Sequence, residues 1–254
     1  MPDLQWNSQT WDGEYKWPKH GEEWSEFWGG AEAQWFSTIY PRIHRFLPAN
    51  AVLEIASGHG RWTKYLLPRC KRYVSVDLAQ SAIDHCKEVY PQGRFFKNDG
   101  LSLEAAEGEF DFVFSFDALV HVEMDVLAGY ITQTLQKLRQ DGAAFFHHSN
   151  ALEFAEEIIH KPDHNIGFRG RSVSGEKVCK IIEARQGRVL VQEKVNWGGD
   201  TKLVDCFTLF ARGPFTEPLV LRNFQFHTEA TLVKEFHSPY SADDRSRRLS
   251  PEGR

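Results

Sequence analysis

The chain carries, at residues 52–60, the stretch Val52-Leu53-Glu54-Ile55-Ala56-Ser57-Gly58-His59-Gly60. It begins as an apolar strand that ends in a carboxylate, continues as a turn with two glycines and leads into a helix expected to open at Arg61. A second apolar strand, residues 73–76, ends in Asp77. Glycines let a backbone approach a ligand, and an acidic side chain after the next strand accepts hydrogen bonds from ribose hydroxyls. The stretch therefore predicts a nucleoside-binding crevice.

Two details of the turn favour S-adenosylmethionine over a dinucleotide. A dinucleotide fingerprint needs a small residue at position 63, where this chain has Thr63, because a pyrophosphate requires close packing of helix on strand. The second detail is Glu54, since a carboxylate repels a pyrophosphate but attracts an amino group and a sulfonium. A nicotinamide-dependent oxidoreductase is accordingly disfavoured.

The sequence downstream continues the pattern. A third strand, residues 94–96, is followed by Asn98-Asp99-Gly100, and a fourth, residues 111–117, ends in Ser115-Phe116-Asp117. With these motifs in register, the sequence resembles the class I S-adenosylmethionine-dependent methyltransferases. Their signature, acidic-x-Gly-x-Gly-x-Gly, stands here as Glu54-x-Ala56-x-Gly58-x-Gly60, with alanine replacing the first glycine. The resemblance covers residues 50–150, and residues 175–212 by strand order.

The rest of the chain alternates between predicted helices and strands. Helices are expected at residues 63–67, 81–90, 125–139 and 174–184, a fifth strand at 142–148, and a hairpin at 187–197 and 205–211. This alternation favours an α/β fold with a parallel sheet and helices on both faces. The resemblance implies a Rossmann-like, seven-stranded, mostly parallel sheet whose last strand is antiparallel.

Three segments are expected along the chain. Residues 1–48 form an N-terminal helical lid or cap rich in tryptophan, with a helix from Glu22 that Pro41 breaks. Residues 49–212 form the core, in which 151–172 is an acceptor loop. Residues 213–254 form a C-terminal tail that is partly mobile, because the chain turns polar there.

Composition restricts the class of protein further. A formal net charge of −5 argues against a nucleic-acid partner, and no apolar run is long enough for a membrane span. The first residues lack the pattern of a signal peptide. The four cysteines are scattered without metal-ligand spacing, so a reduced, cytoplasmic protein is expected. A homo-oligomer is compatible with these features.

The resemblance also implies a set of cofactor-binding residues. Glu54 and the turn that follows would hold the methionine part, Asp77 the ribose and Asp99 the adenine amino group. Turn or helix-capping roles remain the alternative for Asp77, Asp99 and Asp117. The cofactor-binding residues expected are Glu54, Ala56, Ser57, Gly58, Gly60, Asp77, Leu78, Asn98, Asp99, Gly100, Ser115 and Phe116.

Methyl transfer to a hydroxyl requires a general base, because a protonated hydroxyl is a poor nucleophile. Histidine suits this role, since its pKa lies near the working pH. His121 follows Asp117 by four residues, so the two share a face if this turn is helical. In many small-molecule and sugar O-methyltransferases that the sequence resembles, a histidine at this place lines the acceptor pocket and serves as the base, while in other members it has no demonstrated catalytic role.

His147 and His148 end the fifth strand. Alternation along a strand allows one of the pair to reach the cleft, and His148 is the second candidate base, with Asp117 also in the catalytic set. A hydrogen-bonded histidine at the sheet edge is the alternative. A metal ion held by His121, Asp117 and His148 is not expected, because the chain shows no accompanying cluster of carboxylates.

The acceptor is expected to be a small molecule, most simply a sugar or saccharide, because tryptophan rings stack on sugars and basic side chains donate to hydroxyls. Structural roles for the tryptophans and a solvated loop for the basic residues are the alternatives. N-methylation of a small amine and a non-catalytic protein that binds S-adenosylmethionine are the rival functions. Protein or nucleic-acid methylation is disfavoured, because an Asn-Pro-Pro-Tyr motif is absent. The acceptor-binding residues expected are Trp24, Trp28, His147, Asn150, His164 and Arg169.

Overall fold

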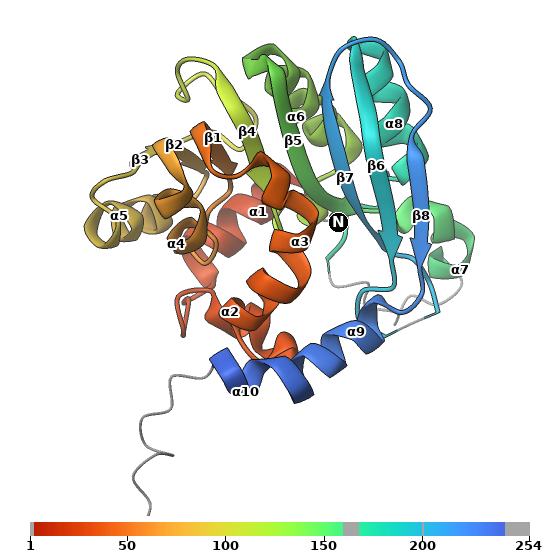
Figure 1. The fold of residues 1–254 in the computed structure, drawn as a ribbon, viewed down its shortest axis with the longest axis horizontal. Helices are drawn as coiled ribbons and strands as arrows, with labels where there is room; N and C mark the ends of the chain where they lie inside the picture. The colour runs from red at the N-terminus through yellow and green to blue at the C-terminus, as the bar shows by residue number, and fades with distance from the viewer. Residues whose placement is uncertain (1–2, 160–167, 200, 242–254) are drawn as a thin grey trace, which may run out of the picture.

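The structure is a computed structural model that describes residues 3–159, 168–199 and 201–241 (Figure 1). These residues form an eight-stranded sheet with the order β3-β2-β1-β4-β5-β7-β6-β8. The strands are β1 (Ala49–Ile55), β2 (Cys70–Asp77), β3 (Arg94–Lys97), β4 (Phe110–Ser115), β5 (Leu138–Ser149), β6 (Gly187–Val195), β7 (Asp205–Arg212) and β8 (Leu219–Asn223).

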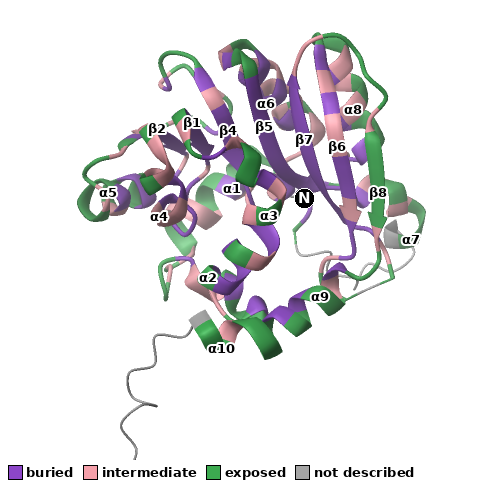
Figure 2. Cartoon of the chain, in the orientation of Figure 1, coloured by how far each residue is buried: buried purple, intermediate pink, exposed green. Residues whose placement is uncertain are grey.

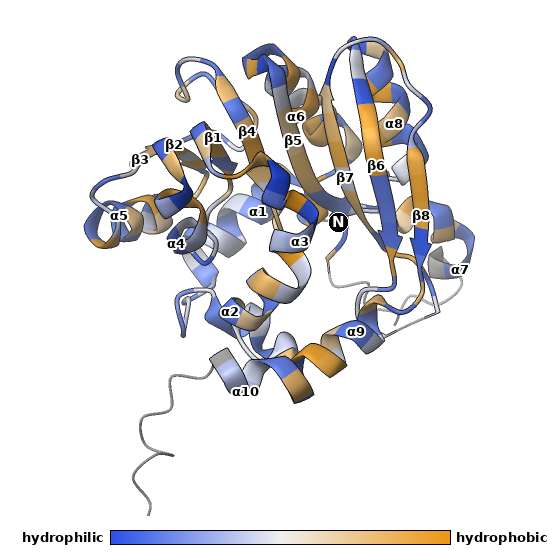
Figure 3. Ribbon diagram, viewed as in Figure 1, coloured by the Kyte–Doolittle hydropathy of each residue, from blue (hydrophilic) through white to orange (hydrophobic). Residues whose placement is uncertain are grey.

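The sheet confirms the predicted α/β class and corrects the number of strands. Strand β1 pairs in parallel with β2 and β4, and β7 is antiparallel to both β5 and β6. The eighth strand, β8, pairs in parallel with β6 at the edge. The sequence predicts a tail over residues 213–254, because the chain turns polar there, and strand β8 lies within that segment. In Figures 2 and 3 this strand is exposed yet apolar.

Alternating strand residues build two cores, one on each face of the sheet. Val52 packs in the first core, and Leu53 packs in the second, as the two-residue period of a strand requires. Helix α6 and helix α8 cover the second face (Figure 1). The α-helices are α1 (Leu4–Gln9), α2 (Ala31–Gln34), α3 (Tyr40–Ile43), α4 (Thr63–Leu66), α5 (Gln80–Val89), α6 (Met124–Lys137), α7 (Ala155–Ile159), α8 (Gly175–Ala184), α9 (Phe226–Leu232) and α10 (Ser238–Ser241).

The N-terminal helical segment does not break at Pro41, contrary to the prediction. Helix α2 continues through a π-helical turn, Trp35–Ile39, into α3, which contains the proline. A proline ring clashes with the carbonyl four residues earlier in a regular α-helix, and the wider π turn just before Pro41 relieves that contact. Trp35 and Ile39 are thereby fully buried in the first core.

The chain after Gly213 is part of the fold as far as residue 241. Beyond β8, helix α9 packs against the N-terminal segment, with the rings of Trp28 and Phe226 6.0 Å apart. Farther along, Ser37 Oγ lies 3.0 Å from Nδ1 of His237. The predicted tail, residues 213–254, therefore contains ordered elements up to residue 241, and its last part, residues 242–254, lies outside the described residues. Within the described ranges, every helix is too short or too polar to cross a membrane.

Candidate active site

A cavity of about 1140 Å³ opens at the carboxyl ends of β1, β2 and β4. We call it the strand-end cavity. Ligands of open α/β sheets bind at this place, because the loops that follow adjacent parallel strands diverge there. Its volume lies slightly above the range of about 300–1,000 Å³ that is usual for small-molecule sites. Residues 3–30, the N-terminal roof, cover the cavity and supply lining residues between Asp3 and Trp28.

The glycine turn, residues 56–60, forms one wall of the cavity. Ala56, Gly58 and Gly60 all have positive φ, at 59°, 53° and 86°. The backbone N–H of Ala56 donates to the carbonyl of Val76 at 2.8 Å, which fixes the turn to β2. A Cβ on Gly58 would lie 2.8 Å from the ring of Trp17. The turn therefore needs glycine both for its conformation and for the close approach of the roof.

Asp77 lies in the cavity wall beside the glycine turn. Its Oδ2 accepts from the N–H of Gly58 at 2.8 Å, and its Oδ1 accepts from the N–H of Ala79 at 2.8 Å. Burial raises the pKa of this carboxyl, against the backbone hydrogen bonds that lower it. Each carboxylate oxygen keeps a further lone pair. Asp77 can therefore accept these two backbone hydrogen bonds and still accept hydrogen bonds from ribose hydroxyls.

The segment after β3 presents Asn98 and Gly100 to the cavity but not Asp99. Oδ1 of Asp99 instead accepts from the N–H groups of Leu101 and Ser102, at 2.9 and 2.7 Å, and the side chain is exposed. Asn98 is held by Tyr130, to whose hydroxyl its Nδ2 donates at 3.0 Å. The structure thus gives Asp99 a turn-stabilising position, and Asn98 rather than Asp99 lines the cavity.

Glu54 and Ser115 lie behind the cavity wall rather than in it. The Glu54 carboxylate accepts from Thr63 Oγ1 at 2.8 Å and from the hydroxyl of Tyr73. Burial raises the pKa of Glu54 to about 7, against these two hydrogen bonds. Ser115 Oγ donates to the carbonyl of Ile55 at 2.9 Å. Glu54 therefore holds helix α4 against the sheet, which also explains why position 63 carries a threonine.

Arg61, which sequence reasoning missed as a site residue, forms an ion pair inside the cavity. Its Nη2 donates to Oδ2 of Asp117 at 2.8 Å, and its guanidinium lies 4.6 Å from the ring centroid of Trp62. Both side chains of the pair are nearly buried. Arg61 follows the glycine turn directly in the sequence, and this position could have indicated that its side chain reaches the cavity.

His121 lines the cavity beneath the roof. Its Nδ1 lies 3.0 Å from the carbonyl of Phe168. A carbonyl only accepts hydrogen bonds, so Nδ1 carries the proton and Nε2 keeps a lone pair. Burial, assisted by the positive charge of Arg169, lowers the pKa of His121 to about 4. The imidazole is therefore neutral at physiological pH and is a weaker base than an ordinary histidine, with its Nε2 lone pair available to accept a hydrogen bond or a proton.

His148 and Asn150 do not reach the cavity. His148 is fully buried, and its Nε2 lies 2.8 Å from Oγ1 of Thr208. Its Nδ1 lies 2.8 Å from the carbonyl of Ser149, so both ring nitrogens have partners. Asn150 Oδ1 accepts from the N–H of Gly175 at 2.7 Å. Strand alternation sends His148 to the opposite face from His147, and the predicted role of His148 as second base has no geometric basis.

His147 forms part of a buried network beneath the cavity floor. Its Nδ1 accepts from the N–H of Asp117 at 3.1 Å, so Nε2 carries the proton and lies 3.1 Å from Oδ2 of Asp205. Arg169, which lines the cavity, donates to both carboxylate oxygens of Asp205 at 3.1 and 2.8 Å. Burial alone would raise the pKa of Asp205, but Arg169 and His147 hold it well below its usual range. The network positions Asp117 and Arg169 from below.

The roof contributes aromatic side chains to the cavity. Trp24 and Trp28, which the sequence predicts as acceptor-binding residues, both line the cavity, where Trp28 is buried and Trp24 is 44% exposed. The roof is attached through Asn7, whose Nδ2 donates to the carbonyl of His121 at 2.7 Å, and through Asp12, whose Oδ1 accepts from the N–H of Gln80 at 2.7 Å. His164 lies outside the described residues. The aromatic lining of the roof comprises Trp6, Trp11, Tyr15, Trp17, Trp24, Phe27 and Trp28.

The residues in this cavity fit the cofactor that the sequence predicts. The glycine turn and Asp77 form a cradle for a nucleoside, Asn98 and Gly100 flank it, and Asp77 supplies acceptors. A bound diphosphate would instead meet the carboxylates of Asp77 and Asp117, with repulsion at short range. A cationic sulfonium suits this donor set.

A sequence comparison identifies the class. Residues 52–142 match the family described as methyltransferase domain. Residues 52–142 therefore form a methyltransferase domain, in agreement with the enzyme class and the cofactor, S-adenosylmethionine, that the sequence predicts. No curated protein sequence matches the chain.

Solved structures support the same fold. One is an S-adenosylmethionine-dependent methyltransferase from Clostridium acetobutylicum, 15% identical, covering 81% of this chain and 97% of that chain with a TM-score of 0.55. Another is the N-methyltransferase NodS from Bradyrhizobium japonicum with S-adenosyl-L-homocysteine, 16% identical, covering 82% and 96% with a TM-score of 0.55. A third, TehB-like, from Corynebacterium glutamicum, is 18% identical, covering 77% and 99% with a TM-score of 0.53. At sequence identities of 15–18%, the similarity to these three structures shows that the chain shares their fold.

Proposed function

We propose that this methyltransferase transfers the methyl group to a hydroxyl of a small acceptor, and that the acceptor is a sugar or saccharide. The observation that carries the proposal is His121, a neutral imidazole in the cavity wall with a lone pair on Nε2. A hydroxyl nucleophile needs such a base, whereas a neutral amine already has its own lone pair.

The walls around His121 support a carbohydrate acceptor. The rings of Trp6 and Trp11 lie 6.3 and 5.4 Å from the His121 ring. Flat aromatic faces bind the apolar faces of sugar rings, while charged groups at the edge bind hydroxyls. Arg61 and Arg169 supply such charged groups in the same cavity.

The chain's own residues have three tasks in this reaction. Asp77 and the glycine turn would hold the nucleoside, the roof excludes water, and His121 removes the acceptor proton through Nε2. The cofactor, when bound, supplies an activated methyl group on a sulfonium. Alignment of acceptor and donor accounts for a large part of the acceleration in such displacements, and the residues of the roof that line the cavity would contribute to it.

The test compares His121→Gln with His44→Gln, a surface histidine outside the cavity, on a panel of mono- and disaccharides with release of S-adenosylhomocysteine as the readout. We expect wild type and His44→Gln to methylate a member of the panel. His121→Gln should lose about 10²–10⁴ in kcat with little change in KM. Full activity of His121→Gln on a hydroxyl acceptor would refute the proposal.

N-methylation of a small amine is the second candidate. It is favoured by carboxylates in the cavity, among them Glu14, Glu123 and Asp125, which could hold a cationic amine. The solved structure of NodS is that of an N-methyltransferase, which adds a precedent within the fold. A panel of small amines run beside the saccharides separates the two, because an amine acceptor should tolerate His121→Gln.

A further inference from the structure

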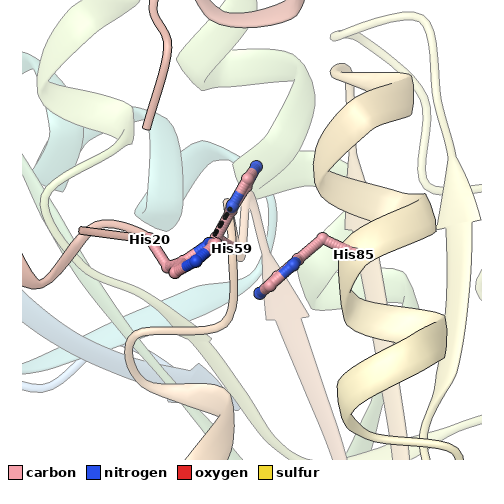
Figure 4. A group of neighbouring side chains, drawn as sticks. All are labelled: His20, His59 and His85. Atoms are coloured by element: carbon pink, nitrogen blue, oxygen red, sulfur yellow. Dashed lines mark hydrogen bonds between the residues drawn. The ribbon is translucent and has the colours of Figure 1, made fainter. Parts of the chain in front are cut away.

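Three histidines meet outside the strand-end cavity, between the roof and the core (Figure 4). His20, His59 and His85 each offer a ring nitrogen, and these nitrogens all lie within 4.8 Å of one another. Nδ1 of His20 lies 3.1 Å from Nδ1 of His59. None of the three belongs to the residues that line the cavity.

The three side chains come from separate parts of the chain. His20 ends a tight turn of the roof, in which its N–H donates to the carbonyl of Trp17 at 3.0 Å and both residues have positive φ. His59 lies between Gly58 and Gly60 in the glycine turn. His85 lies on helix α5, next to Cys86, whose Sγ contacts the carbonyl of Gly58 at 3.3 Å. A link among these three rings would therefore join the roof to the turn and to α5.

The spacing fits a tetrahedral metal ion. Zinc–imidazole bonds are about 2.0–2.1 Å long, so two ligand nitrogens of a tetrahedral site lie about 3.3 Å apart. The His20–His59 separation of 3.1 Å is close to that edge. The ring of His85 stacks on the other two with centroids 4.4 Å apart, so coordination requires a rotation of the His85 side chain toward them.

The chemistry of the cluster also favours a cation. Without a metal ion, one of the two Nδ1 atoms must carry a proton and donate to the other at 3.1 Å, and a metal ion would bind both lone pairs in place of that proton. The carboxylates of Glu23 and Glu88 act electrostatically on His59 and His85. Imidazole ligands select zinc, copper or nickel over magnesium or calcium.

We propose that His20, His59 and His85 bind one divalent transition-metal ion of the zinc class, and that this ion fastens the N-terminal roof onto the glycine turn. The ion has three imidazole ligands and a water as the fourth. It takes no part in methyl transfer, since the trio lies outside the cavity that holds the predicted base. Its effect is to slow the opening of the roof.

The test uses full-length protein free of affinity tags, treated with chelator and titrated with zinc sulfate by calorimetry. We expect one Zn²⁺ per chain. His20→Ala and His85→Ala should weaken binding by about 100-fold or more, since even the loss of a supporting partner costs about 10–100-fold. His44→Ala is the matched control and should bind zinc as wild type does. His59 is left intact, because a change there would also disturb the glycine turn.

A second measurement tests the fastening. The dissociation rate of S-adenosylhomocysteine is compared with and without zinc in wild type and His85→Ala. We expect zinc to slow dissociation from wild type and to have no effect on His85→Ala. Zinc binding that is equal in wild type, His20→Ala and His85→Ala would overturn the site. Tight binding with an unchanged dissociation rate would overturn the fastening role.

Discussion

Arg61 and Asp117 form an ion pair across the strand-end cavity, in which Nη2 of Arg61 donates to Oδ2 of Asp117 at 2.8 Å. The first residue follows the glycine turn after β1, and the second follows β4. Nη1 of Arg61 also contacts Oγ of Ser25 in the roof at 3.3 Å. The guanidinium of Arg61 therefore connects three parts of the site: the glycine turn that it follows, Asp117 after β4, and the roof.

The ion pair should be sensitive to the loss of one partner. Asp117→Ala leaves a nearly buried guanidinium without its carboxylate, and such losses cost about 3–5 kcal/mol. We expect the free energy of unfolding to fall by about 3 kcal/mol in Asp117→Ala and in Arg61→Ala. The double variant should lose no more than the worse single variant. Additive losses in denaturant titrations would contradict a direct interaction.

The pH dependence of methyl transfer should reveal the neutral state of His121. A base must be unprotonated, so activity is lost as pH falls through its pKa, and the pKa of His121 is lowered to about 4. We expect kcat/KM to stay level between about pH 8 and 6, where an ordinary histidine of pKa about 6.5 would begin to protonate. Arg169→Gln removes a positive charge and should move the acid limb to higher pH. An acid limb near 6.5 in wild type would contradict the environment described.

Glu54 should make the stability of the fold depend on pH. Its pKa is raised from 4.5 to about 7, so the folded state binds the proton more tightly than the unfolded chain. The resulting stability is fully present below about pH 4.5 and is lost as pH rises through about 7. The loss corresponds to about 3 kcal/mol at 1.4 kcal/mol per pKa unit. Unfolding of Glu54→Gln, compared with wild type over this window, should lack that part of the slope.

The glycine turn offers a matched pair of substitutions. Ala56 has φ of 59°, where a left-handed alanine costs about 1–2 kcal/mol, so Ala56→Gly should stabilise the protein by about 1 kcal/mol. Gly58→Ala has the opposite sign, since its Cβ would lie 2.8 Å from the Trp17 ring. We expect it to lose stability and to bind S-adenosylhomocysteine more weakly. Equal stability of the two variants in thermal unfolding would contradict the turn geometry.

The core of the fold was predictable because strand alternation and strand-end rules are local in sequence. Short apolar runs such as 52–55 and 73–76 are typical of buried parallel strands. Both runs lie in paired parallel strands of the sheet. Strand β8 was missed because an edge strand buries little, and Leu219 is 56% exposed. Pro41 misled the prediction because the accommodating π turn depends on how Trp35 packs in the core.

The site was predictable to the level of the segment but not of the side chain. Asp77 and Asn98 face the cavity as strand-end residues should, whereas Glu54, Asp99 and His148 turn to other partners. Which way a side chain points depends on contacts from distant segments, such as Thr63 for Glu54 and Thr208 for His148. The histidine trio had no sequence signal, since residues 20, 59 and 85 follow no ligand spacing.

The N-terminal roof bears on the order of events during turnover. Leu4 lies against Gly100, and Trp17 lies against Gly58, while the same segment packs around His121 at the other end. Both ends of the cavity thus lie under one segment, so we expect a movement of residues 3–30 to affect the exchange of donor and acceptor together. A single gating motion should then pace the departure of both products.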